Sequence, residues 1–330
     1  MRGTAELREG RAPRDRLTGL QIGRGVGLAG FALLLALLPF SFPNTFYFEV
    51  AVNVGIAAIV CVGLNLLIGY AGQISLGHAG FFGIGAYASA ILTTSYGWPP
   101  LLALLAGMLL SGGLAFLVAR PILALRGHYL AMATLGLGII VSIVLAQEVE
   151  LTGGPDGMPV DPLVLLGFEV VGPWRWYALV ATALFLVTWL VLNLVDSPIG
   201  RGLRAVHGSE VAARVCGVDT ASYKAMVFVV SAVIASFAGS LFAHFQGWLT
   251  PDEADFLRSI QFVTMVVLGG MASTAGAIVG AALLTALPQF LTVFYDYEHV
   301  MLGLVMMLTM IFLPKGLVPT IAARLRGGAA

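Results

Sequence analysis

The sequence predicts an all-α, polytopic membrane protein with about ten transmembrane helices and two Gly-interrupted segments. Its 330 residues are 59% hydrophobic and only 10% charged, with a mean hydropathy of +0.95. A soluble domain is usually about a quarter charged, so this chain cannot cover a globular surface with polar groups, and lipid must be its solvent. Apolar stretches suited to a bilayer recur along the chain, and basic residues gather in alternate connections.

The first element is an arginine-rich cytoplasmic segment, residues 1–24, which holds six arginines ahead of an apolar run. That run ends without a small-x-small cleavage pattern, so we interpret it as a retained first span rather than a signal peptide. A transmembrane domain then covers residues 25–314, and a cytoplasmic tail covers 315–330. The candidate spans are 26–41, 48–68, 80–96, 101–119, 129–147, 177–195, 225–245, 260–268, 275–294 and 300–313.

An even number of spans places both termini on one side of the membrane. Of the 17 basic residues, only Arg175 and Arg258 then fall on outer segments, so the positive-inside rule places both termini in the cytoplasm. Two outer connections stand out. Residues 148–176 contain the turn sequence TGGPDGMP, and residues 250–259 are acidic. We interpret them either as solvated connections or as a docking surface for an extracytoplasmic partner.

The first Gly-interrupted segment is GYAGQISLGHAGFFGIGAYASA, residues 69–90. Its glycines disfavour a continuous helix, and non-helical backbone at membrane depth must face protein or water. We therefore expect a break inside the bundle, with Ser75 as the N-cap of the helix that restarts. His78 is more readily an interior hydrogen-bonding residue than a ligand or proton carrier. Small residues form one helix face suited to close packing: Ala79, Gly83, Ala86 and Ala90.

The second Gly-interrupted segment is LGGMASTAGAIVGAAL, residues 268–283, in which Gly276 and Gly280 again make a small face. Its Gly-Met-Ala-Ser echoes the Gly-Gln-Ile-Ser of the first break. Paired interruptions point to a permeation site in transporters, although close packing alone also accounts for them. A broken helix can aim its N–H groups at a substrate carboxylate. We predict that the pathway involves Gly72, Gln73, Ser75, His78, Gly270 and Ser273.

Ionisable side chains are almost absent from the spans, where Glu49 and His244 lie near the ends. Ion-coupled carriers usually place carboxylates or histidines in mid-membrane, so transport is either passive or driven by a partner. Neither lysine, Lys224 or Lys315, ends a phosphate-binding G-x-x-x-x-G-K-[ST] loop, and no hydrolase pattern indicates an enzyme. Zero net charge argues against nucleic acid. The two distant cysteines form no metal pair, so we expect no metal and no cofactor.

The longest polar stretch between spans on the inner side is residues 196–224. Ser209 is expected to cap a short helix that begins at Glu210, which pairs with Arg214 at i,i+4. Gly217 ends this helix, and Asp219 caps the next one. A short amphipathic helix of this kind suits insertion into a groove on a cytoplasmic subunit. The alternative is an ordinary interfacial helix that lies on lipid.

Residues 210–217 resemble the EAA---G coupling motif of bacterial ABC importer permeases, with one residue inserted after the Glu. The whole chain resembles the LivM-type permeases of branched-chain amino acid ABC importers. The first break and residues 196–224 carry this resemblance, together with LRGHYLAMATLGLG, LTGGPDGM, SIQFVTMVVLGGMASTAGAIVGAAL and FLPKGL, all in family order. At His128 the family commonly has an acidic residue. The resemblance implies an ATPase-coupling role for Ser209, Glu210, Ala212, Ala213 and Gly217.

The resemblance also implies a multi-pass subunit of the bacterial inner membrane that imports branched-chain amino acids or a related small polar solute. Such a subunit is expected not to be an enzyme, because ATP is hydrolysed by separate partner subunits. Its implied partners are two ATP-binding cassette subunits, a second related permease and an extracytoplasmic substrate-binding protein. Two alternatives stay open. The uncharged spans permit a passive channel for a small neutral solute such as urea, which would act without ATP. A non-transporting scaffold or enzyme subunit would use the Gly breaks for packing only.

Overall fold

The computed structural model describes residues 13–123, 125, 127–165, 167–290, 303, 307, 311 and 316–325. By its internal contacts the chain divides into two units, Met1–Pro43 and Asn44–Ala330. The first unit contains helix α1 (Pro13–Leu37), followed by a short 3-10 helix, η1 (Leu38–Ser41). Pro39 lies in the first turn of η1, and because it has no N–H it cannot continue the α-helical hydrogen bonding.

The second unit consists almost entirely of helices. In chain order they are α2 (Thr45–Asn65), the π-helix η2 (Leu66–Tyr70), α3 (His78–Thr94), α4 (Pro100–Leu123), α5 (His128–Gln147), α6 (Val149–Thr152), η3 (Gly154–Asp156), α7 (Pro173–Asp196), α8 (Pro198–Gly208), α9 (Glu210–Val215), α10 (Thr220–Gln246), η4 (Pro251–Ala254), α11 (Phe256–Gly269), α12 (Thr274–Phe290) and α14 (Leu317–Leu325).

Five helical stretches among the described residues are long and apolar enough to cross a membrane, which fits a polytopic membrane protein. They are Thr45–Tyr70, Pro100–Leu123, His128–Gln147, Pro173–Asp196 and Thr220–Gln246, and shorter apolar helices cover Gly25–Ser41, Phe256–Gly269 and Thr274–Gln289. α3 has 17 residues and α11 has 14, so these helices are only about 25 and 21 Å long. The expected count of ten spans is not confirmed, and the tenth, 300–313, lies almost wholly outside the described residues.

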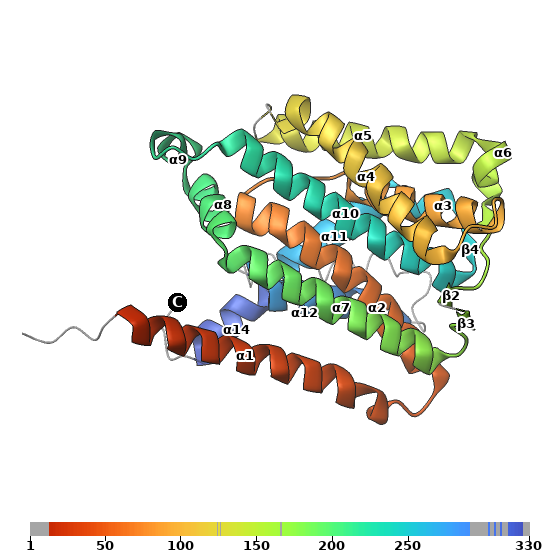
Figure 1. Cartoon of the computed structure of the whole chain (residues 1–330), viewed down its shortest axis with the longest axis horizontal. Coiled ribbons are helices and arrows are strands. Elements are labelled where there is room, and N and C mark those ends of the chain that lie inside the picture. Colours follow the sequence, from red (N-terminus) through yellow and green to blue (C-terminus); the bar gives the residue numbers. More distant parts are fainter. Residues whose placement is uncertain are drawn as a thin grey trace, which may run out of the picture. The chain divides into compact units, whose positions relative to one another are not determined.

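The core of the second unit forms where α2, α3 and α10 pack together. α10 lies between α3 and α4 on one side and α2 on the other, while α2 also packs against α7, α11 and α12 (Figure 1). α2 is apolar all round and buried along most of its length, as expected of an interior helix. α4 and α5 instead expose large aliphatic side chains such as Leu109, Leu117 and Ile140, which suits contact with lipid.

Glycines permit a very close helix crossing between α3 and α10. A Cβ added to Gly85 would lie 2.1 Å from the Ser236 carbonyl oxygen, and one added to Gly239 would lie 1.9 Å from the Phe82 carbonyl oxygen. The face predicted for close packing is also buried, and Gly83 meets Ala254 of η4. Small residues therefore let the two backbones touch, as small-xxx-small patterns do in membrane helices.

The connection with the turn sequence is joined to the residues that lead from α10 into the acidic connection. Strand β1 (Met158–Pro159) pairs antiparallel with β4 (Trp248–Leu249), which follows α10 directly. His244 of α10 bonds the Asp161 carbonyl oxygen through Nδ1 at 2.9 Å. A second small hairpin pairs β2 (Val164–Leu165) with β3 (Phe168–Glu169). These contacts hold the 148–172 connection over the end of the bundle where α10 ends.

Candidate functional site

The two Gly-interrupted segments meet inside the second unit. The N–H of Ala272, in the turn between α11 and α12, donates to Asn65 Oδ1 at 3.0 Å, and Asn65 ends α2. Gly69 lies directly against the same turn, because a Cβ there would approach the Ala272 nitrogen to 2.2 Å. Ala272 has φ +59°, the one positive φ among the described non-glycine residues. Such a conformation costs energy and is held by its surroundings.

The first break differs in detail from the prediction. The helix does not stop at Gly69 but continues as the π-turn η2, a feature often found at functional sites. Residues 72–77 are then non-helical, and Gly72 has φ +69°. Gly72 lies against the imidazole of His207 of α8, so a side chain at this position would meet that ring.

Ser75 does not cap the helix that restarts, which corrects the prediction. α3 begins at His78 with Gly77 as its N-cap residue and without a side-chain cap. The Ser75 hydroxyl instead lies 2.9 Å from His78 Nδ1, because the intervening turn brings it to the imidazole. His78 Nε2 lies 2.6 Å from the hydroxyl of Ser231, which itself donates to the Gly63 carbonyl oxygen at 2.8 Å. His78 is thus a buried link between α2, α3 and α10.

Gln73 is the residue of the first break with hydrogen-bonding capacity to spare. It is 3% exposed, and neither atom of its side-chain amide has a partner among the described residues. A buried amide without partners costs free energy, which is unusual for a purely structural position. The assignment of Gln73 and the other break residues to a substrate pathway stays a prediction.

The second break is closed by local hydrogen bonds and by the C-terminal segment. Ser273 Oγ accepts from the Gly276 N–H at 3.0 Å and so caps the start of α12. Gly270 has φ +122°, and Gly316 packs directly on its backbone. Gly280 packs on the Met265 carbonyl, so α11 and α12 form a tightly packed hairpin whose glycines make the contact.

The helix α9 forms as its sequence predicts. Ser209 Oγ accepts from the Ala212 N–H at 3.3 Å, and Gly217 has φ +81° just after the helix ends. Asp219 accepts from the Ser222 hydroxyl at 2.6 Å and from its backbone N–H at 3.3 Å. These hydrogen bonds hold the pKa of the Asp219 carboxyl below its usual value.

α9 is anchored on one side and exposed on the other. Glu210 forms ion pairs with Arg214 at 3.4 Å and with Lys224 of α10, a lysine that is almost fully buried. Ala213 faces inward at 3% exposure, while Val211 and Val215 are 66% and 83% exposed. A short helix with exposed valines on a fixed base has the form expected of a docking element.

A cavity of about 470 Å³ lies where α7, α8 and both breaks come together. Its walls include Gly69 and Tyr70 from the first break and Ala272 from the second. Arg204 and His207 from α8 and Asp196 from the end of α7 complete the polar side. The polar segment 196–224 therefore lines one cavity together with both breaks, a link that the sequence could not reveal because it joins residues far apart in the chain.

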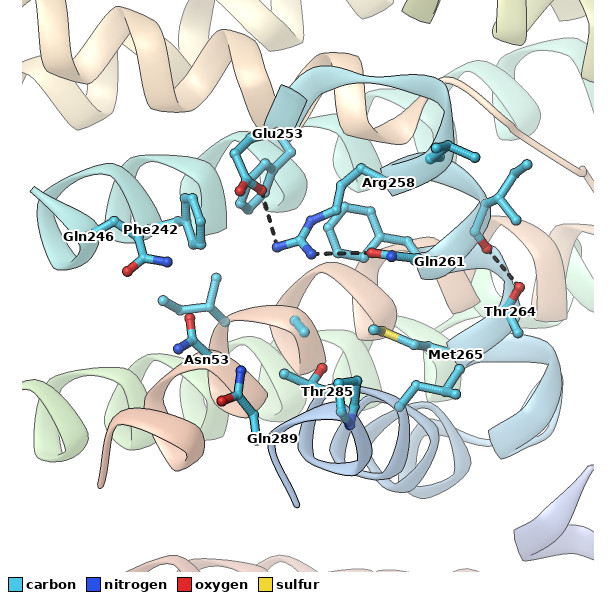
Figure 2. Close-up of a pocket in the computed structure, with 18 of the residues that line it drawn as sticks. Asn53, Phe242, Gln246, Glu253, Arg258, Gln261, Thr264, Met265, Thr285 and Gln289 are labelled. Carbon is cyan, nitrogen blue, oxygen red and sulfur yellow. Dashed lines mark hydrogen bonds and ion pairs between the residues drawn. The ribbon is translucent and has the colours of Figure 1, made fainter. Parts of the chain in front are cut away.

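A second cavity, of about 390 Å³, lies at the C-terminal end of α10. It is lined by parts of α2, α3, α10, η4, α11 and α12 (Figure 2). Arg258 of α11 forms an ion pair with Glu253 at 3.2 Å and donates to Gln261 Oε1 at 3.2 Å. Its guanidinium carbon lies 5.8 Å from the centre of the Phe242 ring and 5.4 Å from that of Phe262.

This polar cavity was not predicted from the sequence. Arg258 and Glu253 were expected on an outer connection, and the only signal in the sequence was an arginine and an acid five residues apart beside an apolar helix. Neither described cavity is lined by the six residues predicted for the pathway. Within the described residues, no three His, Cys, Asp or Glu side chains gather as a metal site requires.

Comparison with known proteins decides the family. The sequence matches the family described as "Branched-chain amino acid transport system / permease component" over residues 46–310. The chain belongs to this permease family. The permease is 36% identical to the high-affinity branched-chain amino acid transport system permease protein LivM of Salmonella typhimurium, over 84% of this chain and 71% of that protein. It is 36% identical to LivM of Escherichia coli, over 86% and 72% of the two chains.

The permease also matches a second type of permease protein. It is 25% identical to LivH of Escherichia coli, over 79% of this chain and 90% of that protein. No solved structure matches the permease. The membership confirms the resemblance on which the sequence analysis relied, and it makes the chain a membrane-embedded component of branched-chain amino acid transport.

Proposed function

We propose that this permease is one of two related membrane subunits of an importer in the bacterial inner membrane. In this proposal it carries branched-chain amino acids inward, and ATP hydrolysis in two separate subunits drives the transport. The observation that carries the proposal is α9, which exposes Val211 and Val215 to a partner while Glu210 binds Lys224 of α10. Both termini and the 196–224 segment face the cytoplasm, where the basic residues concentrate.

Two contact routes support force transfer from α9 to the breaks. Through α10, Lys224 lies two turns from Ser231, which bridges Gly63 of α2 and His78 of α3. Through α8, His207 lies against Gly72 and lines the cavity whose walls include residues of both breaks. Movement of a docked ATPase subunit would shift α9, α8 and α10 together and change the access that the breaks allow.

The similarity to both LivM and LivH supports a pair of related permeases in one transporter. On the outer side, the 148–172 connection and the β1–β4 pair offer an ordered surface to an extracytoplasmic binding protein. This binding protein would set most of the substrate choice. The permease itself contributes the pathway and its opening.

The proposal is tested by placing a charge on the exposed face of α9 in the assembled importer, reconstituted into liposomes. Val211→Asp and Val215→Asp should each lower ATP-driven leucine uptake at least tenfold, because a carboxylate on an apolar docking face loses hydration without a partner. Ala213→Asp and Gly217→Asp should have the same effect by distorting the helix. All four variants should still insert into the membrane. The control Ala221→Asp adds the same charge in the first turn of α10 and should leave leucine uptake unchanged.

Normal uptake in the Val211→Asp and Val215→Asp variants would remove the docking role of α9. Leucine or urea uptake by the permease alone, without ATP or partner subunits, would favour the passive channel instead. Both outcomes are read from the same flux measurement.

A further inference from the structure

The cavity around Arg258 has the charge pattern of an amino acid site. A zwitterionic amino acid carries no net charge but a carboxylate and an ammonium on neighbouring atoms. The cavity offers the complementary arrangement. Arg258 Nη2 and Glu253 Oε2 lie 3.2 Å apart, and the charges of the two side chains also sum to zero. Beside such an ion pair, each charge of a zwitterion can face a charge of opposite sign. A simple anion or cation would instead lie beside one charge of its own sign.

Arg258 has hydrogen-bonding capacity that its described neighbours do not use. A guanidinium has five N–H groups in a fork that fits a carboxylate. In the described part of the chain, Nη1 donates to Gln261, while the buried Nε has no hydrogen-bond partner. Thr285 Oγ1 of α12 also lines the cavity and is buried without a partner. Figure 2 shows these groups, with Asn53, around the same space.

The arginine is held in place by its surroundings. Phe242 and Phe262 lie within cation–π distance of the guanidinium, and these two rings belong to different helices, α10 and α11. Glu253 fixes it from the η4 side, as seen in Figure 2. A guanidinium fixed in this way presents its donors without losing further rotational freedom, which favours binding of a carboxylate.

The rest of the wall mixes apolar side chains with neutral polar ones, among them Gln246, Gln261 and Gln289. Ile56 and Ala57 of α2, Leu257 and Met265 of α11 and Leu284 of α12 line the cavity. Small-molecule sites typically combine such an apolar lining with a few convergent polar groups, in volumes of roughly 300–1,000 Å³. The volume of about 390 Å³ falls at the lower end of that range and suits a small ligand with an aliphatic side chain.

We propose that this cavity is a transit site for an α-amino acid. Arg258 receives the carboxylate, Glu253 receives the ammonium, and the apolar part of the wall takes the aliphatic side chain. The assignment rests on the proposed transport function, and it places substrate recognition within the permease as well as in the binding protein. The simpler role for the pair is a clamp that ties η4 to α11.

The test is protection of a thiol in the assembled importer, with the binding protein left out. In a Cys216→Ser background, which removes the exposed native thiol, Asn53→Cys places a reporter in the cavity, and Ser95→Cys places a control at an exposed position just after α3. Leucine should slow maleimide labelling of Asn53→Cys but not of Ser95→Cys. Leucinamide, which keeps the side chain and ammonium but has no carboxylate, should need at least tenfold higher concentration for the same protection.

The arginine is tested in the same assay. Arg258→Gln in the Asn53→Cys background should abolish protection by leucine, and Arg258→Lys, which retains the charge without the fork, should weaken it at least tenfold. Arg175→Gln removes the other arginine assigned to the outer side and should leave protection unchanged. If Arg258→Gln does not assemble, Arg258→Lys carries the test.

Equal protection by leucine and leucinamide, or full protection in the Arg258 variants, would overturn the site. The Arg258–Glu253 ion pair would then only hold η4 against α11. ATP-driven leucine uptake, with the binding protein restored, is measured on the same Asn53→Cys preparation. ATP-driven uptake without protection by leucine would overturn the site and leave the transport function standing. Protection without ATP-driven uptake would support the site and contradict the proposed transport function.

Discussion

At the residue scale, the least expected feature is a buried lysine in a chain that has only two. Lys224 is 6% exposed at the start of α10, and Glu210 of α9 supplies its counter-charge. A buried ammonium is tolerated only when it is paired, so this ion pair holds α9 against α10. The sequence located both residues in the 196–224 segment but paired Glu210 only with Arg214, since i,i+4 neighbours can be read from spacing and contacts between helices cannot.

Glu210→Gln should destabilise the permease, because it leaves Lys224 without its counter-charge. Removing one partner of a fully buried pair costs about 3–5 kcal/mol, and partial solvent access of Glu210 reduces this to roughly 1–3 kcal/mol. The expected result is a lower thermal midpoint of the purified protein in detergent. Glu210→Gln combined with Lys224→Met should recover most of the loss, since no buried charge is left unpaired and Arg214 is half exposed to solvent. An unchanged midpoint in the single variant would show that the pair does not anchor α9.

At the scale of elements, local pattern predicted where helices lie but not how the breaks are built. Each expected span before residue 290 overlaps a helix, because apolar length is a local property of the chain. The π-turn through Gly69 and the cap at Gly77 depend instead on distant partners. Asn65 binds Ala272 across the bundle, and Ser231 binds His78, so the first break takes its shape from α10 and from the second break.

The crossing of α3 and α10 predicts a sharp difference between two identical substitutions. Gly239→Ala should destabilise the permease by about 1–3 kcal/mol, because its methyl group would meet the rigid carbonyl of Phe82. Gly113→Ala makes the same change in α4, where nothing lies within 4 Å, and should be neutral or slightly stabilising. Size-exclusion profiles and thermal midpoints of the two variants provide the comparison. Equal behaviour would contradict the close backbone contact.

At the scale of the whole molecule, composition alone established a membrane protein, and the 196–224 segment indicated a partner. The cavity around Arg258 could not be predicted from the sequence, because its described walls come from six separate elements, α2, α3, α10, η4, α11 and α12. Its two charged residues appeared to belong to an outer connection. In our proposal the permease is a membrane subunit that takes its energy from partner subunits. In our proposal, motion enters at α9 on the cytoplasmic side and reaches both breaks through α8 and α10.

The most direct measurement uses the two native cysteines. Cys216 is exposed just after α9, whereas Cys61 is buried in α2, so a membrane-impermeant maleimide should label only Cys216. Cells that contain the permease should be labelled only after they are opened, and added ATPase subunits should protect the site. Cys216→Ser should abolish the signal. Labelling of Cys216 in intact cells would place α9 outside the cytoplasm and contradict the account.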